Sequence, residues 1–384
     1  MKILIIGVRR KCYKAALKLG HEVLLWSDGP LHESRKKKLT DTLEVPYAEC
    51  ARGLSREVLS FLARHEISRV IANTEETVIL GARVRRALNL KTLAIDVIDR
   101  FHNKYVMKNS AKAAGIPITR YELITDTTTA EELVDSLGLP LVIKPVDESG
   151  AEGVIVARTV GKVKSLMAPG LLAEQFVEGS EISVETFIEN GKPVFHNITE
   201  YLHQWKKSAI PAELTEKTRA RVLELNDRVI EHFGVDRGMT HSEFYLTKNG
   251  PVFGEIAIRP PGGYYMELIS KVYGFDAWEV YVKLSCGEKV GKLNQLPDGI
   301  AAVVMLHPGP GEIVSIDGET RIREYFKNLI ELKIRVEPGD RVDEHTNTSN
   351  EIGHILFWEE SREQMIKAID FFEKNLTITV RPKT

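Results

Sequence analysis

Apolar runs and helical stripes alternate along the first part of the chain. The apolar segment Lys2–Ile6 predicts a strand, Gly7 a turn, residues 15–17 part of a helix, and Glu22–Trp26 a second strand. This order is typical of a βαβ unit with a parallel sheet. A further helix is predicted from Glu75 to Leu88. The first 100 residues therefore predict one α/β domain.

The first turn of this domain argues against one common ligand. A dinucleotide-binding turn of this type requires Gly-x-Gly-x-x-Gly, so that the backbone can approach a pyrophosphate. The chain has Gly7-Val8-Arg9-Arg10-Lys11-Cys12, with bulky cations where the second glycine should be. We therefore do not expect NAD to bind at this turn.

Helical and strand patterns continue through the rest of the chain. Asn103 can cap a helix that stops at Gly115, and residues 141–144 form an apolar strand that ends in a lysine. A helical stripe runs from 218 to 233. Alternating apolar residues on both sides of Asn249-Gly250 predict a β-hairpin. More strands follow after about residue 300, then an amphipathic helix from 361 to 374.

Composition and charge limit the class of protein. The 384 residues are 43% hydrophobic and 28% charged, with a formal net charge of −2 and a pI near 6.6. This balance gives no whole-chain attraction to nucleic acid or to an anionic membrane. Cys12, Cys50 and Cys286 are too scattered for a disulfide framework or a zinc site. Because no stretch approaches the roughly 20 apolar residues of a membrane span, we expect a soluble, cytoplasmic protein.

Two acidic residues of the predicted hairpin are the strongest candidates for chemistry. Glu243 and Glu255 flank the turn at similar distances, so antiparallel pairing can bring them together. Two adjacent carboxylates repel each other unless a cation lies between them. Arg259 and the stiff turn Pro260–Gly263 follow, and carboxylates that hold Mg²⁺ beside an arginine suit a phosphorylated ligand. The alternative is a surface hairpin with ordinary charges.

Two earlier segments suggest a nucleotide. Lys144 ends a strand before the glycine-bearing loop 147–153, which can form a phosphate cradle or a plain hairpin turn. In the segment 172–185, the apolar pair Phe176-Val177 lies between carboxylates. Such a segment can contact an adenine and a ribose, or it can be a strand with solvated acids. Lys104, taken alone, is an ordinary lysine at a helix start.

Together these segments resemble an ATP-grasp enzyme. The resemblance rests on the order of Lys104, Val142-Ile143-Lys144-Pro145, the Ser-Gly-x-x-Gly-Val loop, Glu174-x-Phe176-Val177-x-Gly179-x-Glu181, His241-Ser242-Glu243-Phe244 and Glu255-x-x-x-Arg259-x-x-Gly262-Gly263, over roughly residues 100 to 290. The N-terminal unit is similar to the Rossmann-like pre-grasp domain. The tail is similar to the closing C-terminal subdomain of biotin carboxylase-like and amino-acid ligase members.

The resemblance implies an ATP-grasp fold of the α/β and α+β classes. The expected domains are a pre-grasp domain at 1–100, an ATP-grasp domain at 101–295 with a small lid subdomain at about 115–180, and a C-terminal subdomain at 296–384.

It also implies roles for individual residues. Lys104 and Lys144 would hold the α- and β-phosphates of ATP, Glu243 and Glu255 would hold Mg²⁺ or Mn²⁺, and Arg259 would stabilise charge on the transferred phosphoryl group. The remaining ATP contacts would come from the phosphate loop, the adenine segment and the ribose carboxylate, which are Ser149, Gly150, Gly153 and Val154; Glu174, Phe176 and Val177; and Glu181.

One position departs from the pattern of many family members. Ala257 stands where they have an asparagine two residues after the second metal glutamate, which leaves one or two metals open. Glu-x-Ala-x-Arg is similar to the bacilysin synthetase type of L-amino acid ligase. The substrate pocket would be lined by His203, Trp205, His241, Gly262 and Gly263, although such histidines and tryptophans serve as packing residues at least as often.

The function implied is an ATP-dependent carboxylate–amine ligase. Its substrates would be a small carboxylate and an amine, both amino acids, joined as a dipeptide-type amide through an acyl phosphate. The alternative enzyme is a carboxylase or a purine-pathway formyl- or carboxyl-transferring member, and a third reading is a nucleotide-binding module without chemistry. No nucleic-acid or membrane partner is expected. Homodimers are common among similar enzymes.

Overall fold

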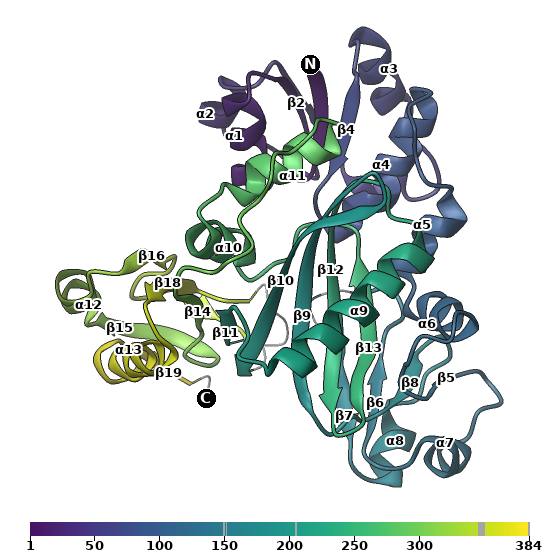
Figure 1. Ribbon diagram of the computed structural model, residues 1–384, viewed down its shortest axis with the longest axis vertical. Coiled ribbons are helices and arrows are strands. Elements are labelled where there is room, and N and C mark those ends of the chain that lie inside the picture. The colour runs from purple at the N-terminus through teal and green to yellow at the C-terminus, as the bar shows by residue number, and fades with distance from the viewer. Residues whose placement is uncertain (149, 151, 204–205, 345–349, 383–384) are drawn as a thin grey trace.

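The computed structural model describes all residues of the chain except 149, 151, 204–205, 345–349 and 383–384. Its N-terminal region is a parallel sheet with helices against it (Figure 1). The strand order is β3-β2-β1-β4. The strands are β1 (Lys2–Ile6), β2 (Glu22–Ser27), β3 (Asp41–Glu44) and β4 (Arg69–Ala72), and the helices are α1 (Arg10–Lys18), α2 (Glu33–Lys36), the 3₁₀ helix η1 (Tyr47–Cys50), α3 (Arg56–Arg64) and α4 (Glu75–Ala87). The βαβ start predicted from the apolar pattern is confirmed.

A small antiparallel sheet and four helices follow. The strand order is β5-β8-β6-β7. Its strands are β5 (Tyr121–Leu123), β6 (Leu141–Lys144), β7 (Ile155–Ala157) and β8 (Leu172–Gln175), and the helices are α5 (Ile95–His102), α6 (Lys104–Ala113), α7 (Ala130–Leu137) and α8 (Val160–Leu166). As predicted, Asn103 caps α6, since its Oδ1 accepts hydrogen bonds from the amides of Tyr105 and Val106 at 3.0 and 3.1 Å.

A large antiparallel sheet forms the centre of the molecule (Figure 1). The strand order is β13-β12-β9-β10-β11-β14-β18-β16. The strands are β9 (Ser180–Glu189), β10 (Lys192–His203), β11 (Lys207–Ile210), β12 (Gly238–Thr247), β13 (Gly250–Ala257), β14 (Ile300–Leu306), β16 (Leu329–Ile334) and β18 (Gly353–Glu359), and the helices that pack on this sheet are α9 (Glu216–Phe233), α10 (Tyr265–Tyr273) and α11 (Ala277–Ser285).

Strand alternation gives this sheet two different faces. Ile182, Val184 and Phe244 point to one face and share a core with α9. Ser183 and Glu185 alternate with them and therefore point to the other face. On that second face, Phe187 and Met239 pack in a core with α10, α11 and the N-terminal sheet. The face of β9 and β12 that packs against α9 is therefore mostly apolar, with Thr186, Thr240 and Ser242 as buried polar residues, whereas the other face carries Ser183, Glu185 and Glu243.

The last part of the chain adds a three-stranded sheet of order β17-β15-β19 and two helices, and it supplies β14, β16 and β18 to the central sheet. These elements are β15 (Gly311–Asp317), α12 (Glu319–Tyr325), β17 (Arg341–Val342), α13 (Arg362–Asn375) and β19 (Thr377–Arg381). The central sheet combines strands from both sides of residue 296, and one core cluster joins the N-terminal sheet to α10 and α11. The domain boundaries expected at 100 and 295 therefore stay a prediction.

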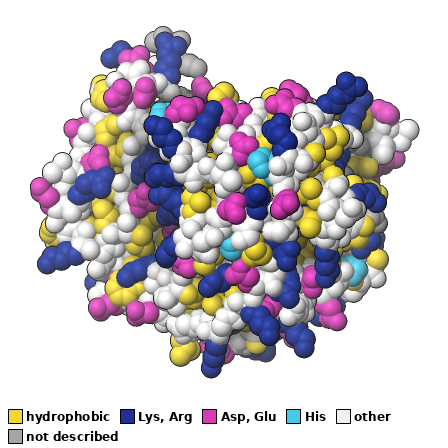
Figure 2. Space-filling view, turned by 90° about the horizontal axis from the view of Figure 1, so that it is seen from above, with side chains coloured by type: hydrophobic (Ala, Val, Ile, Leu, Met, Phe, Trp, Pro, Cys, Tyr) yellow, Lys and Arg dark blue, Asp and Glu magenta, His cyan; other side chains and the backbone are white. Residues whose placement is uncertain are grey.

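Two surface properties bear on partners. Acidic and basic side chains are interspersed over the face shown in Figure 2, in keeping with the near-neutral net charge. Over the part of the chain that the structure describes, no helix combines the length and the apolar character needed to cross a membrane.

Candidate active site

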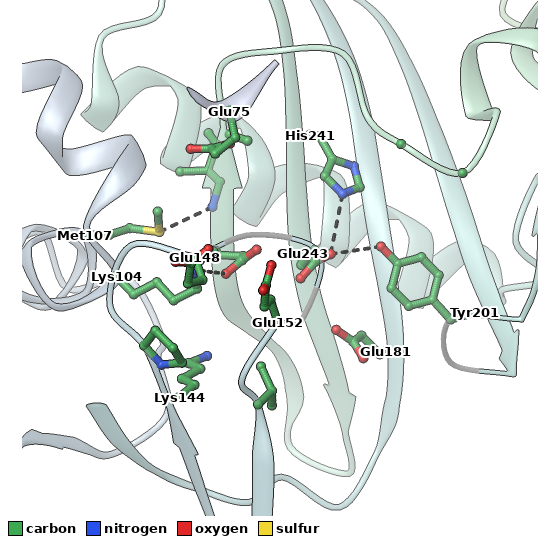
Figure 3. Close-up of a pocket in the computed structure, with 18 of the residues that line it drawn as sticks. Glu75, Lys104, Met107, Lys144, Glu148, Glu152, Glu181, Tyr201, His241 and Glu243 are labelled. Carbon is green, nitrogen blue, oxygen red and sulfur yellow. Dashed lines mark hydrogen bonds and ion pairs between the residues drawn. The ribbon is translucent and has the colours of Figure 1, made fainter. Parts of the chain in front are cut away.

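A cavity of about 650 Å³ lies where the small sheet, the central sheet and the N-terminal helices meet (Figure 3). This volume is in the range of sites that enclose a small molecule. Most of the residues predicted from the sequence line it. They are Lys104, Lys144, Gly150, Val154, Glu174, Phe176, Val177, Glu181, His241, Glu243, Glu255, Arg259, Gly262 and Gly263.

Two of the described residues predicted for the site are not part of this lining. Gly153 lies in the same loop as Gly150 without lining the cavity, and His203 lies at the exposed end of β10. Ser149 and Trp205 lie outside the described residues. The structure therefore brings the phosphate loop to the cavity but does not bring His203 there.

The hairpin of β12 and β13 places Glu243 directly opposite Glu255. Thr247 pairs with Gly250, so the turn residues are Lys248 and Asn249, one position earlier than expected. From that turn, uninterrupted pairing would set Glu243 opposite Gly254 and turn Glu255 to the other face. A β-bulge between Glu243 and Phe244 shifts the register by one residue and brings both carboxylates to the cavity face.

A third carboxylate joins this pair. Burial, then the charges of Glu243 and Glu255, raises the pKa of Glu181 from 4.5 to about 8. Like charges that disturb one another in this way favour a cation between them. Among the described residues there is no cluster of three or more metal-type side chains already arranged around one point. Glu243 and Glu255 fit a divalent cation whose other ligands come from a bound phosphate or water, the ligand set that Mg²⁺ favours.

Glu243 is held from two sides by neutral and cationic donors (Figure 3). Tyr201 donates a hydrogen bond to its Oε1 at 3.0 Å, and His241 Nε2 lies 3.4 Å from the same atom. Burial alone would raise the pKa of Glu243, but the contact with His241 and the hydrogen bond from Tyr201 lower it. Glu243 therefore stays ionised and is fixed in direction.

A fully buried carboxylate stands behind His241. Glu185 Oε1 lies 2.9 Å from His241 Nδ1 and accepts a hydrogen bond from Ser183 at 2.7 Å. Its Oε2 accepts from Asn197 at 2.6 Å and from Thr199 at 2.7 Å. Burial opposes protonation of His241, yet the hydrogen bonds to Glu185 and Glu243 outweigh it and raise the pKa of His241 to about 9. The result is a polar chain from the sheet interior to Glu243.

The side chain of Glu174 forms ion pairs with two lysines, which was not predicted from the sequence. Its carboxylate lies 2.6 Å from Lys108 Nζ and 2.7 Å from Lys144 Nζ, and Thr119 donates a further hydrogen bond to it. Only 3% of Glu174 is exposed. With its oxygens paired with two lysines, this carboxylate holds Lys144 in place, and its contact with an adenine stays a prediction.

Lys104 lies near the carboxylate pair. Its Nζ is 3.7 Å from Glu255 Oε2 and also donates a hydrogen bond to the carbonyl of Glu148 in the phosphate loop. Glu152 of the same loop projects toward the carboxylates in Figure 3. A negative charge at this point would repel a phosphate.

Arg259 is joined to the N-terminal region. Its Nε lies 2.6 Å from Glu75 Oε2 at the start of α4, and His102 Nδ1 lies 3.3 Å from the other oxygen of Glu75. Burial would raise the pKa of Glu75, but His102 and Arg259 lower it to about 2. Three residues after Arg259 there is open space beside Gly262, since a Cβ added at Gly262 would meet no atom within 4 Å.

Several of these residues were not predicted from the sequence, and two had usable signals. Lys108 lies one helical turn after Lys104 in α6, and Glu75 follows the carboxyl end of the parallel strand β4, where such sheets bind ligands. Glu185 lies on β9, which pairs with β12, and Tyr201 lies on β10, which pairs with β9, and neither pairing could be foreseen.

Comparisons with known proteins agree with this geometry. Three family models match parts of the chain: an ATP-grasp domain at residues 158–266, the ATP-grasp (A) domain of phosphoribosylglycinamide synthetase at 102–203, and the L-amino acid ligase C-terminal domain 2 at 303–381.

Similar sequences and structures come from the same group of enzymes. The L-arginine-specific L-amino acid ligase of Bacillus subtilis is 22% identical over 80% of this chain and 79% of its own. A formate-dependent phosphoribosylglycinamide formyltransferase of Flavobacterium psychrophilum is 22% identical over 65% of this chain and 71% of its own. The crystal structure of an L-amino acid ligase from Bacillus licheniformis superposes with a TM-score of 0.84, 19% identity and coverage of 99% of this chain and 98% of that one. The predicted fold class is confirmed.

Proposed function

The chain belongs to the ATP-grasp family of ligases, and from this premise we propose that it joins the carboxylate of one amino acid to the amine of another, with hydrolysis of ATP to ADP and phosphate. The observation that carries the proposal is the convergence of Glu243, Glu255 and Lys104 in one cavity, since together they suit a triphosphate and its divalent cation. The L-amino acid ligase C-terminal domain and the amino-acid ligase relatives support the choice of substrates.

Nucleotide binding is assigned to the lysine side of the cavity. Lys104 and Lys144 donate hydrogen bonds to phosphate oxygens, and Lys144 is held for this by Glu174. Phe176 and Val177 flank the adenine. The amide of Phe176 already donates to the carbonyl of Pro140 at 3.3 Å, so adenine recognition falls to the side chains and to Val177. Glu181 accepts hydrogen bonds from the ribose.

Glu243 and Glu255 would hold Mg²⁺ or Mn²⁺, and such an ion, when bound, neutralises charge on the phosphate oxygens. Tyr201 and His241 keep Glu243 aimed at that position. Arg259, four residues after Glu255 along the chain, adds a planar cation for the transferred group.

The reaction has two steps. First, an oxygen of the substrate carboxylate attacks the γ-phosphorus in line, the bond from that phosphorus to the β,γ-bridging oxygen breaks, and ADP leaves. Second, the amine attacks the acyl carbon, the bond to the phosphoryl oxygen breaks, phosphate leaves, and the nitrogen loses a proton. Because an acyl phosphate hydrolyses readily, the cavity must exclude water between the two steps.

The test uses the purified chain with ATP, Mg²⁺ and pairs of L-amino acids. We expect phosphate release that requires a carboxylate and an amine together, and a product whose mass is the sum of the two substrates minus water. Hydroxylamine in place of the amine should give a hydroxamate, which reports the acyl phosphate directly. ADP formation without any carboxylate substrate would overturn the proposal.

A second candidate function is an ATP-dependent carboxylase or a purine-pathway enzyme that transfers a carboxyl or formyl group. It is favoured by the match of residues 102–203 to the phosphoribosylglycinamide synthetase domain. The same assay separates the two functions, because a requirement for bicarbonate or formate would favour the second.

A further inference from the structure

The N-terminal sheet contributes one end of the cavity. In this sheet β1 lies between β2 and β4. After β1 the chain adds β2 and β3 on one side, and it then crosses to add β4 on the other side. This is a switch point of a parallel sheet, and ligands bind in the crevice outside the carboxyl ends of the strands there. Arg9 follows β1 and Glu75 follows β4, and both residues line the cavity. Figure 3 shows Glu75 and Lys144 on opposite sides of the carboxylates.

Gly7 lets the loop after β1 lie close to the end of β4. Its φ is +103°, and a Cβ added there would lie 2.3 Å from Asn73 Oδ1. A side chain at this position would therefore push the loop away from the switch point. Arg9, one of the cations after Gly7 that argue against a dinucleotide, is thus placed at the edge of the cavity.

Arg9 is a partly buried cation that has one hydrogen-bond partner among the described residues, and the charge of Glu267 acts on it from beyond ion-pair distance. Its NH1 donates to the carbonyl of Pro261 at 2.5 Å, and within the described ranges no carboxylate lies in ion-pair distance of it. Burial, then the neighbouring charge of Arg259, lowers the pKa of Arg9 to about 10. A desolvated guanidinium without a carboxylate is costly, and an anionic ligand would remove that cost.

Arg9 and Arg259 approach the same turn but differ in their partners. Arg259 NH1 donates to the carbonyl of Pro260, the residue before the one that Arg9 contacts. Glu75 pairs with Arg259 at 2.6 Å, and Lys11, in the first turn of α1, pairs with Glu267 at 3.1 Å. Arg9 is therefore the arginine at this end whose fork is available for a ligand.

We propose that Arg9 binds the free carboxylate of the amine-bearing substrate, so that the acceptor is an α-amino acid rather than a simple amine. This inference rests on the proposed function, because only in an amide ligase of this kind does one substrate keep its carboxylate through the reaction. The planar fork of an arginine matches a carboxylate with two parallel hydrogen bonds. The position of Arg9 at the end away from Lys144 keeps this carboxylate apart from the one that is phosphorylated.

The test compares an acceptor amino acid with its carboxamide, starting with L-alanine and L-alaninamide, at a fixed donor taken from the screen of pairs. The wild-type chain should prefer the acid, and Arg9→Met should lower the ratio of kcat/KM for acid over amide by about tenfold or more. The ratio is measured in one preparation, so the fraction of folded enzyme cancels. Arg10→Met, which changes the exposed neighbour that does not line the cavity, should keep the wild-type ratio.

The outcomes separate this inference from the proposed function. If Arg9→Met lowers activity with acid and amide equally, Arg9 only supports the fold and the inference is overturned. A rise in the KM of the donor instead of the acceptor would also overturn it. If Arg9→Met does not fold, Arg9→Lys keeps the charge without the fork and should give an intermediate ratio. If the wild-type chain forms no hydroxamate, the proposed function itself fails, and this inference fails with it.

Discussion

Two buried groups of charged side chains lie at the same cavity and differ in how their charges are paired. In the first, Lys108 and Lys144 enclose Glu174, and each charge has an opposite partner within 2.7 Å. In the second, Glu243 and Glu255 lie opposite each other and their charges also act on Glu181, while His241 lies 3.4 Å from Glu243 and Lys104 lies 3.7 Å from Glu255. Each side chain of the first group is ion-paired at close range, although two lysines and one glutamate leave a net charge of +1, whereas the second group brings like charges together.

This difference predicts that the first group contributes mainly to stability and the second mainly to activity. A balanced buried pair costs stability when one partner is removed, because the other is left as an uncompensated charge. An unbalanced group of carboxylates already carries repulsion, which a bound cation would relieve. Variants in the two groups should therefore have opposite effects on stability and on activity.

Glu255→Gln should have the largest effect on activity. We expect a fall in kcat on the order of 100-fold or more, because a carboxylate that offsets charge in the transition state is lost. In chelator, its free energy of unfolding should equal or exceed that of the wild type, since one like charge has been removed from the group. Urea unfolding and ADP release measure the two effects.

Glu224→Gln, an exposed change on α9, is the matched control and should behave as the wild type. Full activity of Glu255→Gln would break the comparison, because Glu255 would then be an ordinary surface acid.

Lys108→Met should have the largest effect on stability. Lys108 is 1% exposed, and its loss leaves Glu174 with a single lysine, so the free energy of unfolding should fall by about 3 kcal/mol. Lys112→Met, on the exposed side of the same helix, should change it little. In the double variant with Glu174→Gln the two losses should not add, because each change removes the charge that the other would strand. Additive losses would show that Lys108 and Glu174 do not form one unit.

The two groups also differ in how far the sequence revealed them. The hairpin, the Asn103 cap and the strand that ends at Lys144 follow from local patterns of turn residues, capping residues and apolar runs. The approach of Glu243 to Glu255 was predicted as well, but its cause was not. A simple two-residue hairpin would have placed these glutamates on opposite faces. The bulge that corrects the register has Gly254 as its extra residue, and a glycine inside a strand is a local signal for a bulge that was not used in predicting the register.

The ion pairs of the first group were not predicted because its members are distant in sequence. Glu174 is followed by apolar residues that suit an adenine, and nothing near it in the chain shows a lysine. Lys108 reaches it only because α6 packs under the small sheet. From the sequence, Arg9 was used only as an argument against NAD binding. Its contact with Pro261 could not be predicted, because the two residues are 252 positions apart. Contacts of this kind depend on tertiary packing and leave little trace in local sequence.

Glu181→Gln should sharpen the comparison through pH. The pKa of Glu181 in the folded chain is raised from 4.5 to about 8, so between these values the folded state keeps a proton that the unfolded state loses. In chelator, this group therefore lowers the free energy of unfolding as pH rises from about 4.5 to 8. The glutamine variant should lose that slope, and Mg²⁺ with ATP should reduce it in the wild type. An unchanged slope in the variant would mean that Glu181 does not share the repulsion.

Tyr201→Phe should have the smallest effect, because it removes one hydrogen bond from Glu243 and leaves the contact with His241 in place. We expect a loss of about 1 kcal/mol in the free energy of unfolding in chelator. With Mg²⁺ and ATP at saturation the loss should be smaller, since Glu243 would then be held by the cation as well as by His241. Tyr325→Phe, which changes an exposed tyrosine of α12, is the matched control. A loss that is the same with and without the nucleotide would show that Tyr201 supports the sheet independently of the carboxylate group, and the distinction between the two groups of charges would then end at Glu243.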